Sequence, residues 1–242
     1  MTKNFKVLNN TMKKGLECRL KSFLKRHPEI EQKNGMFHYK NSPYLVKLPK
    51  SFSEELCRIL GIIHGDGNMS NSRILICDKC KEYHKTIQEL FQKVFNATPN
   101  LFHDKNRHTY YSHLKRKAVY LFLVEVLEVP SGSVRKNLLL PSHVNSWDGK
   151  LKGSYLGGLL DSEGHVSKLQ AKINFTTTSK PLFDFAENFL AKNKIKFGIY
   201  KRKRRRQNEL EINIYGKKNI KKLLNYTCLL NADKKTRLEK FL

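Results

Sequence analysis

The sequence predicts an α+β protein made of two similar halves related by a pseudo-twofold axis. Three observations lead to this fold class. The order helix–strand–strand–helix–strand–strand–helix occurs twice, in units of about a hundred residues, and two copies are too few for a solenoid. An apolar helix that ends in an acid-glycine pair opens each unit. A short leucine-proline lead-in precedes each of these helices, at Leu48-Pro49 and Leu140-Pro141.

Hydrophobic periodicity and turn residues predict the elements of the N-terminal segment and the first unit. Apolar residues at helical spacing indicate a helix from Met12 to Arg26. Ser53 is a suitable N-cap, and the acids after it suit the first turn of a helix. The remaining expected elements are short strands at Met36–Tyr39 and Tyr44–Leu48, a helix at Leu56–Gly65, a strand at Arg73–Cys77, a helix at Tyr83–Phe95, strands at Leu101–His103 and Thr109–Leu114, and a helix at Ala118–Leu127.

The second unit repeats this order. Its expected elements are a helix at Lys152–Ser162, strands at His165–Leu169 and Lys172–Thr177, a helix at Pro181–Lys192, strands at Phe197–Lys201 and Glu209–Tyr215, and helices at Lys217–Asn225 and Asp233–Phe241. The chain therefore divides into an N-terminal extension over residues 1–48, a first half over 49–130, a linker over 131–150 and a second half over 151–242.

The charge balance points to a polyanionic partner. The chain carries 47 Lys and Arg against 21 Asp and Glu, a net charge of +26. Nucleic acid is the simplest partner for such a charge, because each neutralised phosphate releases a counterion. No stretch approaches the ~20 apolar residues of a membrane span. Five scattered cysteines and a polar N-terminus favour a reducing compartment, either the cytoplasm or an organellar matrix, over secretion.

The two helices that open the units carry small residues at positions where another backbone can approach. Each interior glycine costs about 1 kcal/mol relative to alanine, so a compensating contact is expected. Close packing of the two helices against each other supplies it. The expected interface glycines are Gly61 and Gly65 in the first helix and Gly157 and Gly158 in the second, with Gly153 one turn before Gly157.

Such packing brings together the acids that end the two helices, Asp66 and Glu163, which are 97 residues apart. Two carboxylates at two negative helix ends repel each other, and a divalent cation relieves that repulsion. Hard oxygen ligands favour Mg²⁺ or Mn²⁺ over Zn²⁺. A site of this kind can activate water and stabilise the leaving oxygen of a phosphodiester. For either acid alone, a solvated helix stop is the simpler interpretation, but two copies in matching contexts favour a shared site.

The paired segments Ile59–Gly67 and Leu156–Gly164 resemble the two motifs of monomeric LAGLIDADG homing endonucleases, and the resemblance extends from about Val46 to the C-terminus. It implies two αββαββα halves whose antiparallel sheets form a saddle on double-stranded DNA. It also implies that Asp66 and Glu163 are the essential acids. His64 replaces the first Asp of the consensus, whereas Asp161 keeps it.

The resemblance implies a monomeric, Mg²⁺-dependent endonuclease that cuts both strands of a long, asymmetric or pseudo-palindromic site. Two alternatives on the same scaffold stay open. One is an intron maturase that binds RNA, with or without cleavage of DNA. The other is a DNA-binding regulator, although intact acids at both positions argue against lost catalysis. A basic protein of the membrane surface is a more distant alternative.

Strand alternation separates candidate DNA-reading residues from core residues. The expected contacts to DNA are Arg73, Lys172, Asn174, Thr176, Asn213 and Tyr215 on the strands, and Arg202, Arg204, Arg205 and Arg206 in a basic run that we expect at a hairpin tip on phosphates. Four lysines after strands are weaker candidates for assisting catalysis, namely Lys79, Lys180, Lys117 and Lys217. Cys77, Cys80 and His84 have metal-like spacing, but a zinc site needs four ligands and the chain has no second CxxC pair.

Overall fold

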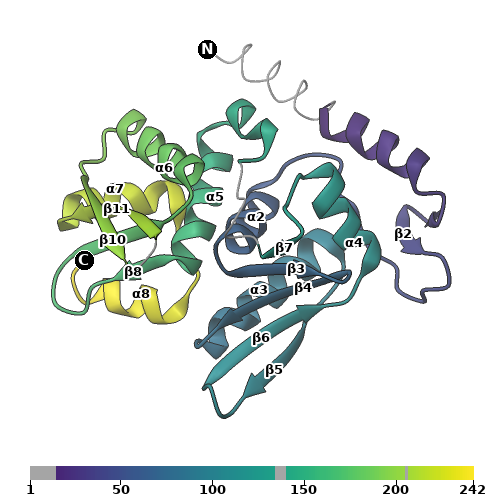
Figure 1. Ribbon diagram of the computed structural model, residues 1–242, viewed down its shortest axis with the longest axis horizontal. Coiled ribbons are helices and arrows are strands. Elements are labelled where there is room, and N and C mark those ends of the chain that lie inside the picture. The colour runs from purple at the N-terminus through teal and green to yellow at the C-terminus, as the bar shows by residue number, and fades with distance from the viewer. Residues whose placement is uncertain (1–14, 134–139, 205–206) are drawn as a thin grey trace.

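The fold consists of two antiparallel sheets with a pair of helices between them (Figure 1). The computed structural model describes residues 15–133, 140–204 and 207–242. One sheet has the strand order β5-β6-β4-β3-β7, and the other has the order β10-β11-β9-β8. The first four strands of one sheet and the four strands of the other therefore follow the same order, as two repeated units require. Over these residues no helix has the length and apolar character to cross a membrane.

The first half contains the motif helix, two antiparallel strand pairs, three further helical segments and a short fifth strand. Its elements are α2 (Glu54–Asp66), β3 (Gly67–Ser70), β4 (Arg73–Asp78), α3 (Lys81–Phe95), β5 (Asn100–Asp104), β6 (Thr109–Leu114), α4 (Lys117–Leu121), the π-helical turn η1 (Phe122–Val126) and the two-residue strand β7 (Gly132–Ser133). The Ser53 side chain caps α2 by accepting a hydrogen bond from the Leu56 amide. The N-cap predicted from the sequence is thus confirmed.

The second half repeats these elements and adds a final helix. After the 3₁₀ turn η3 (Ser142–Ser146) come α5 (Gly149–Ser162), β8 (Gly164–Val166), β9 (Lys172–Thr177), α6 (Lys180–Lys192), β10 (Gly198–Arg204), β11 (Gln207–Tyr215), α7 (Lys217–Thr227) and α8 (Ala232–Glu239). Because α8 follows the seven-element unit, nothing in the first unit is equivalent to it. It packs next to β8, at the end of the motif helix α5.

The N-terminal segment packs against the first half (Figure 1). A helix over residues 15–26 leads into the hairpin of β1 (Ile30–Lys33) and β2 (Met36–Tyr39). Phe23 is fully buried in the common core, and the Arg19 guanidinium bonds Glu128 at 2.7 Å. This part of the predicted extension is therefore a structural cover for α4 and η1.

The motif helices α2 and α5 pack against each other more extensively than any other two elements of the described chain. A Cβ added to Gly61 would lie 3.0 Å from the Gly158 Cα, and one added to Gly158 would lie 2.9 Å from the Gly61 Cα. A Cβ on Gly65 would collide with the Ser162 side chain. Gly61 with Gly158, and Gly65 with Ser162, are equivalent pairs under the 97-residue offset. The pseudo-twofold axis therefore passes between the two helices.

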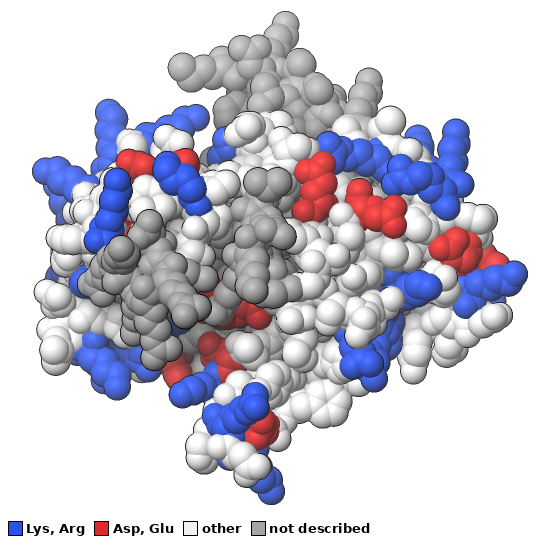
Figure 2. All heavy atoms as spheres, in the orientation of Figure 1, with Lys and Arg blue, Asp and Glu red and all other residues white. Residues whose placement is uncertain are grey.

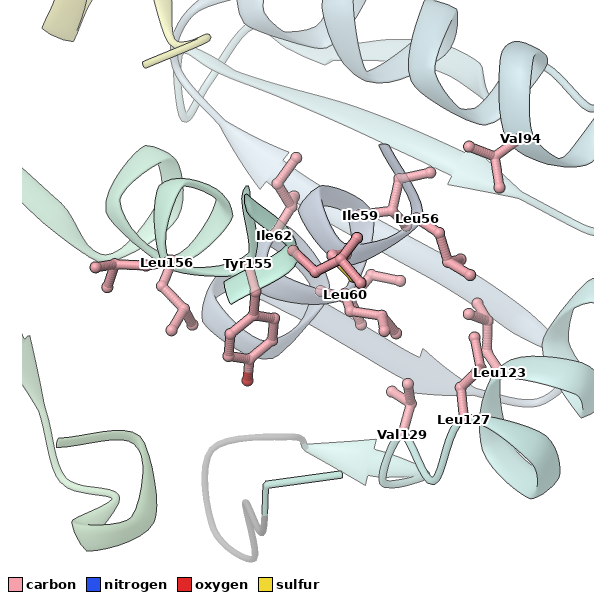
Figure 3. Close-up of a cluster of buried hydrophobic side chains, with 14 of the residues drawn as sticks. Leu56, Ile59, Leu60, Ile62, Val94, Leu123, Leu127, Val129, Tyr155 and Leu156 are labelled. Atoms are coloured by element: carbon pink, nitrogen blue, oxygen red, sulfur yellow. The ribbon is translucent and has the colours of Figure 1, made fainter. Parts of the chain in front are cut away.

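One hydrophobic cluster spans both halves and includes this helix pair. Figure 3 shows part of it, with Leu56, Ile59, Leu60 and Ile62 from α2, Tyr155 and Leu156 from α5, and Leu123, Leu127 and Val129 from the end of the first half. The shared cluster means that the two motif helices belong to the core and are not free surface helices.

Several local predictions were wrong. Tyr44–Leu48 is not a strand, since only Val46 forms an isolated bridge to Phe37. The hairpin instead turns at Asn34 and Gly35, both at positive φ. Residues after Asp66 form β3 where the sequence indicated a turn, because strand pairing with β4 outweighs the local preference of Gly67-Asn68. The strand expected at His165–Leu169 ends at Val166.

The glycines of α5 differ in what they contact. Gly158 faces α2, as expected. Gly157 faces both the Arg58 guanidinium of α2 and the Thr227 carbonyl of α7, and Gly153 faces the Tyr226 carbonyl of α7. These two glycines therefore allow α7 to approach α5, in addition to the contact between the motif helices.

A candidate metal and nucleic-acid site between the two halves

Asp66 and Glu163 end the two motif helices at their point of contact. Asp66 is the last residue of α2, and Glu163 is the C-cap of α5. A Cβ on Gly65 would lie 3.3 Å from the Glu163 Cγ, which places the neighbour of Asp66 directly against Glu163. Both acids are half-buried. The structure thus brings together the two carboxylates that the sequence singled out.

Two buried polar pairs cross the helix interface at equivalent positions. Arg58 of α2 donates to Asp161 of α5 at 3.1 Å, and His64 of α2 bonds the Tyr155 hydroxyl of α5 at 2.6 Å. The 97-residue offset relates Arg58 to Tyr155 and His64 to Asp161. The Arg58–Asp161 contact and the Tyr155–His64 contact are therefore equivalent under the pseudo-twofold axis. The first is an ion pair and the second is a neutral hydrogen bond.

The chemistry of each pair follows from its burial. Burial raises the pKa of Asp161, and Arg58 together with the Leu230 and Asn231 amides counteracts this by favouring the charged carboxylate. Burial lowers the pKa of His64 to about 3, so this imidazole is neutral near neutral pH. His64 can take the place of an aspartate here because its partner is a tyrosine hydroxyl and carries no charge that needs neutralising.

Lys234 of α8 is a residue near the acids that the sequence did not single out. Its ammonium donates to the last carbonyl oxygens of α5, those of Leu160 at 3.0 Å, Asp161 at 2.5 Å and Ser162 at 2.9 Å. Burial lowers the pKa of Lys234, and the nearby acids Asp161, Asp78, Asp66 and Glu163 oppose that effect. Lys234 therefore places a positive charge at the negative end of the helix that carries Glu163.

The four lysines proposed from the sequence lie at the ends of strands or the starts of helices. Lys117 donates to the Tyr39 hydroxyl at 2.6 Å, and Lys180 forms an ion pair with Asp184. Lys79 follows β4 and Lys217 begins α7, and both are exposed. Lys117 and Lys180 thus have structural partners, whereas Lys234 makes the contacts at the motif-helix end.

The sheet faces alternate as the sequence predicted. Ile173 and Phe175 are buried, whereas Lys172, Asn174 and Thr176 lie half-buried on the opposite face of β9. Arg73 is likewise exposed beside buried Ile74. The Lys172 ammonium lies 5.3 Å from the centre of the Tyr215 ring.

Asn213 differs from the other candidates on this face. Its side chain is only 1% exposed, and its amide donates to Glu211 at 2.7 Å. The expectation that Asn213 is open for base contact is therefore wrong for this conformation. Tyr200, which lies against Gly198 beside Asn213, is instead 47% exposed on the same face.

The basic run is only partly a hairpin tip. Lys201 and the backbone of Arg202 and Arg204 continue β10, in register with β11. Arg205 and Arg206 lie outside the described residues. The strands are therefore longer than predicted, because residues after Lys201 pair with Glu209, Asn208 and Gln207.

The proposed CxxC group is divided between two environments. Cys77 is exposed on the open face of β4, whereas Cys80 is buried at the start of α3. The His84 ring is fully buried and bonds the Ser112 hydroxyl at 2.7 Å. In this arrangement His84 is a core residue of the first half.

Charge is unevenly distributed on the face that Figure 2 presents. Lys and Arg side chains gather toward its margins, and several acidic side chains lie near the middle. A broad area over the first half carries neither charge.

Comparison with known proteins gives a family match in the second half and a fold match across both halves. Residues 150–227 match the LAGLIDADG-like domain. The homing endonuclease I-DmoI in complex with DNA and Mn has a TM-score of 0.52 and 16% identity, over 72% of this chain and 95% of that chain. The N-terminal LAGLIDADG domain of WhiA has a TM-score of 0.52 and 15% identity, over 78% and 85%.

A curated relative is the glutamine–fructose-6-phosphate aminotransferase of Methanocaldococcus jannaschii, which is 30% identical over 214 residues. These residues are 85% of this chain but only 19% of the aminotransferase, so the chain spans about a fifth of the length of that relative. The match therefore carries no conclusion about aminotransferase chemistry. Residues 150–227 thus match a LAGLIDADG-like domain, and the described chain shares the two-halved LAGLIDADG fold of I-DmoI and WhiA.

Proposed function

We propose that this protein is a site-specific endonuclease that hydrolyses both strands of duplex DNA with a divalent metal ion. The observation that carries the proposal is the meeting of Asp66 and Glu163 at the contacting ends of α2 and α5. This position lies between two sheets that each leave one face open, in a chain of net charge +26. The I-DmoI likeness supports the proposal, because that protein is a homing endonuclease seen with DNA and Mn.

The donor chemistry at the two helix ends fits Mg²⁺ or Mn²⁺. Asp66 and Glu163 offer only oxygen ligands, which these hard cations prefer. Within the described part of the chain no cluster of three or more His, Cys, Asp or Glu side chains is arranged to hold a metal. Two carboxylates are nevertheless sufficient for Mg²⁺, which commonly keeps waters and takes further ligands from substrate phosphates. A bound ion would supply Lewis-acid polarisation of the scissile phosphate and of the attacking water.

The chain's own residues orient the acids in this proposal. The Gly67 amide donates to the Ile63 carbonyl and fixes the backbone after Asp66. Lys234 holds the carbonyls that precede Glu163, and its charge favours the ionised state of both acids. The glycine contact between Gly61 and Gly158 sets the helix spacing, and therefore the separation of the two carboxylates.

The half-buried and exposed residues on the open faces would bind the duplex. Lys172, Asn174 and Thr176 on β9, and Arg73 on β4, can reach base edges in the major groove. Exposed lysines just after strands, such as Lys79 and Lys115, can neutralise phosphates on either side of the groove. Because one chain holds both motif helices, we propose that a monomer is the active form.

A cleavage screen tests the proposal. The purified chain is incubated with a randomised duplex library and Mg²⁺, and fragments cut on both strands are sequenced. We expect fragments that share one long site, and we expect none when EDTA replaces the metal. Random nicking, or no cleavage with Mg²⁺ or Mn²⁺, would contradict an endonuclease.

A DNA-binding protein that does not cleave is the second candidate. The N-terminal LAGLIDADG domain of WhiA matches this chain at the same TM-score as the I-DmoI complex, so the fold alone does not distinguish the two. Selective binding in the same library without any cut product would support this alternative. Both candidates predict tight binding to duplex DNA, and only the metal-dependent step separates them.

A further inference from the structure

The open faces of the two sheets carry different chemistry at matched positions. Both sheets have the same strand order, so each position on one face has a counterpart on the other. On β4, Leu75 and Cys77 stand where β9 has Asn174 and Thr176. On β6, Tyr111 pairs with Cys77, whereas on β11 it is Glu211 that pairs with Thr176. At the two matched positions on the central strands, the first sheet thus has Leu75 and Cys77 where the second has Asn174 and Thr176. The row of Leu75 also holds the polar residues Asn68, Asn100 and His113.

The residues of the first sheet form one continuous patch. Phe102 on β5 pairs with Tyr111 on β6, and Tyr111 pairs with Cys77 on β4. Leu75 lies two residues before Cys77, on the same face. His113 pairs with Leu75 on this face, and its ring centre lies 6.0 Å from that of Phe102. We call Leu75, Cys77, Phe102 and Tyr111 the first-sheet patch, which His113 borders. Phe102 is 52% exposed and Cys77 is exposed, while Leu75 and Tyr111 are half-buried.

This patch lies away from the core of the first half. Ile74 and Ile76 point to the opposite face of β4 and are each 1% exposed, under α2 and α3. Exposed cations stand at the ends of the patch, with Arg73 and Lys79 at the two ends of β4 and Lys115 just after β6. An apolar surface bordered by cations is suited to a groove of nucleic acid, whose phosphates lie on both sides of the bases.

Within the major groove of duplex DNA the thymine C5-methyl is the apolar group that a side chain can contact. The other base edges there present hydrogen-bond donors and acceptors, which lose water against an apolar patch without gaining a partner. We propose that Leu75, Cys77 and Phe102 of the first sheet contact thymine methyl groups in its half-site, whereas the second sheet presents Asn174 and Thr176 for hydrogen bonds at the matched positions. This proposal rests on the proposed function, since it specifies how the same DNA-binding surface selects its sequence.

Uracil substitution tests the proposal directly, because deoxyuridine differs from thymidine only by the missing methyl group. A randomised duplex library is first bound to the full chain in EDTA, which gives a bound site without cleavage. The selected duplex is then made with uracil for thymine in the left half, in the right half or in both. We expect the affinity to fall about fourfold for each contacted methyl in one half, and to change little in the other.

Two substitutions assign the sensitive half-site to the first sheet. Leu75→Asn with Cys77→Thr introduces the residues found at the matched positions of β9. We expect that uracil in place of thymine no longer lowers the DNA affinity of this double variant. That loss of affinity in the wild type is called the uracil penalty here. Asn174→Ala is the matched control, and it should weaken binding while leaving the uracil penalty as in the wild type.

The outcomes separate this proposal from the proposed function. If no duplex is selected, DNA binding itself is refuted. If a duplex is selected but uracil has no effect, or has equal effects in the two halves, methyl recognition by one sheet is overturned. A penalty that persists in the Leu75→Asn, Cys77→Thr variant overturns the assignment to the patch. The wild-type uracil comparison decides the central claim even if the double variant fails to fold.

Discussion

Asp66 and Glu163 are equivalent residues under the pseudo-twofold axis, yet one is an aspartate that ends its helix and the other a glutamate that caps its helix. At the scale of single residues, the proposed reaction depends on the negative charges of these two side chains. Their shapes matter less, because metal binding responds first to charge and to oxygen donors.

We expect Asp66→Asn and Glu163→Gln each to abolish double-strand cleavage and to leave DNA binding unchanged or tighter. Each substitution keeps the shape of the side chain but removes a charge, so metal affinity falls while repulsion of DNA phosphates is relieved. Cleavage rate and binding constant on one selected duplex, with and without Mg²⁺, check this expectation. Glu89→Gln, at an exposed position of α3, is the matched control and should cleave normally. Near-normal cleavage by either acid variant would refute the two-acid mechanism.

The sequence was sufficient to predict these acids but not every residue of the site. The acids end strongly periodic apolar helices, which is a local signal that occurs twice. Lys234 had no such signal, because its contacts with α5 arise only when α8 folds back onto the motif helix. The burial of Asn213 could not be predicted either, because strand alternation gives the face on which a residue lies but not the side chains that cover it there.

At the scale of elements, the close approach of α2 and α5 matters most for the proposed site, because the spacing of these helices sets the distance between the two acids. We expect Gly158→Ala to destabilise the protein by about 1–3 kcal/mol, since the added methyl meets backbone of α2 and the helices must move apart. Urea unfolding measures this. Gly149→Ala is the matched control, because no atom lies within 4 Å of its Cβ position and alanine favours helix. An unchanged unfolding free energy for Gly158→Ala would contradict the packing described here.

The contact of the N-terminal segment with η1 contains a histidine between two acids. His27 lies 2.8 Å from Glu29 through one ring nitrogen and 2.8 Å from Glu125 through the other. Because carboxylates accept, both nitrogens donate when the ring is protonated. Burial acts to lower the pKa of His27, but these two hydrogen bonds outweigh it and raise the pKa above its usual value of 6.5.

A raised pKa means that the folded state holds this proton more tightly than the unfolded chain does. The resulting stability is fully present below the unfolded pKa and is lost as the pH rises through the folded value. We therefore expect the unfolding free energy of the wild type to fall more than that of His27→Gln between about pH 6 and pH 8. His103→Gln, on the exposed strand β5, is the control. Equal pH dependence of wild type and His27→Gln would show that the bridge does not contribute.

Elements with a strong local hydrophobic pattern could be predicted from the sequence, whereas short strands that depend on pairing could not. The long helices and the strands β4, β6 and β9 were predicted closely, because their hydrophobic period is strong within the segment. β1, β3 and β7 have four residues or fewer and are stabilised by pairing with other strands, which a local pattern does not contain. The π-helical turn after α4 gave no sequence signal distinct from that of an ordinary helix.

The two halves share one hydrophobic cluster at the scale of the whole molecule, so they form one body around the paired motif helices. A rigid pair of sheets can bind a long duplex without a large ordering cost. In the proposed function, the net charge of +26 would govern how strongly the molecule binds DNA of any sequence, while the open sheet faces would select the site.

We accordingly expect DNA affinity to fall steeply with salt. If the two sheets neutralise about six to ten phosphates, the affinity should drop by roughly a thousandfold to a hundred-thousandfold between about 50 and 200 mM salt. Fluorescence anisotropy on a selected and on an unrelated duplex measures this slope. Lys115→Gln, at an exposed position just after β6, should lower the slope of log affinity against log salt by about 0.9 and weaken both duplexes alike. A flat salt dependence would mean that the positive charge does not contact phosphate, and a loss confined to the selected duplex would show that Lys115 reads bases instead.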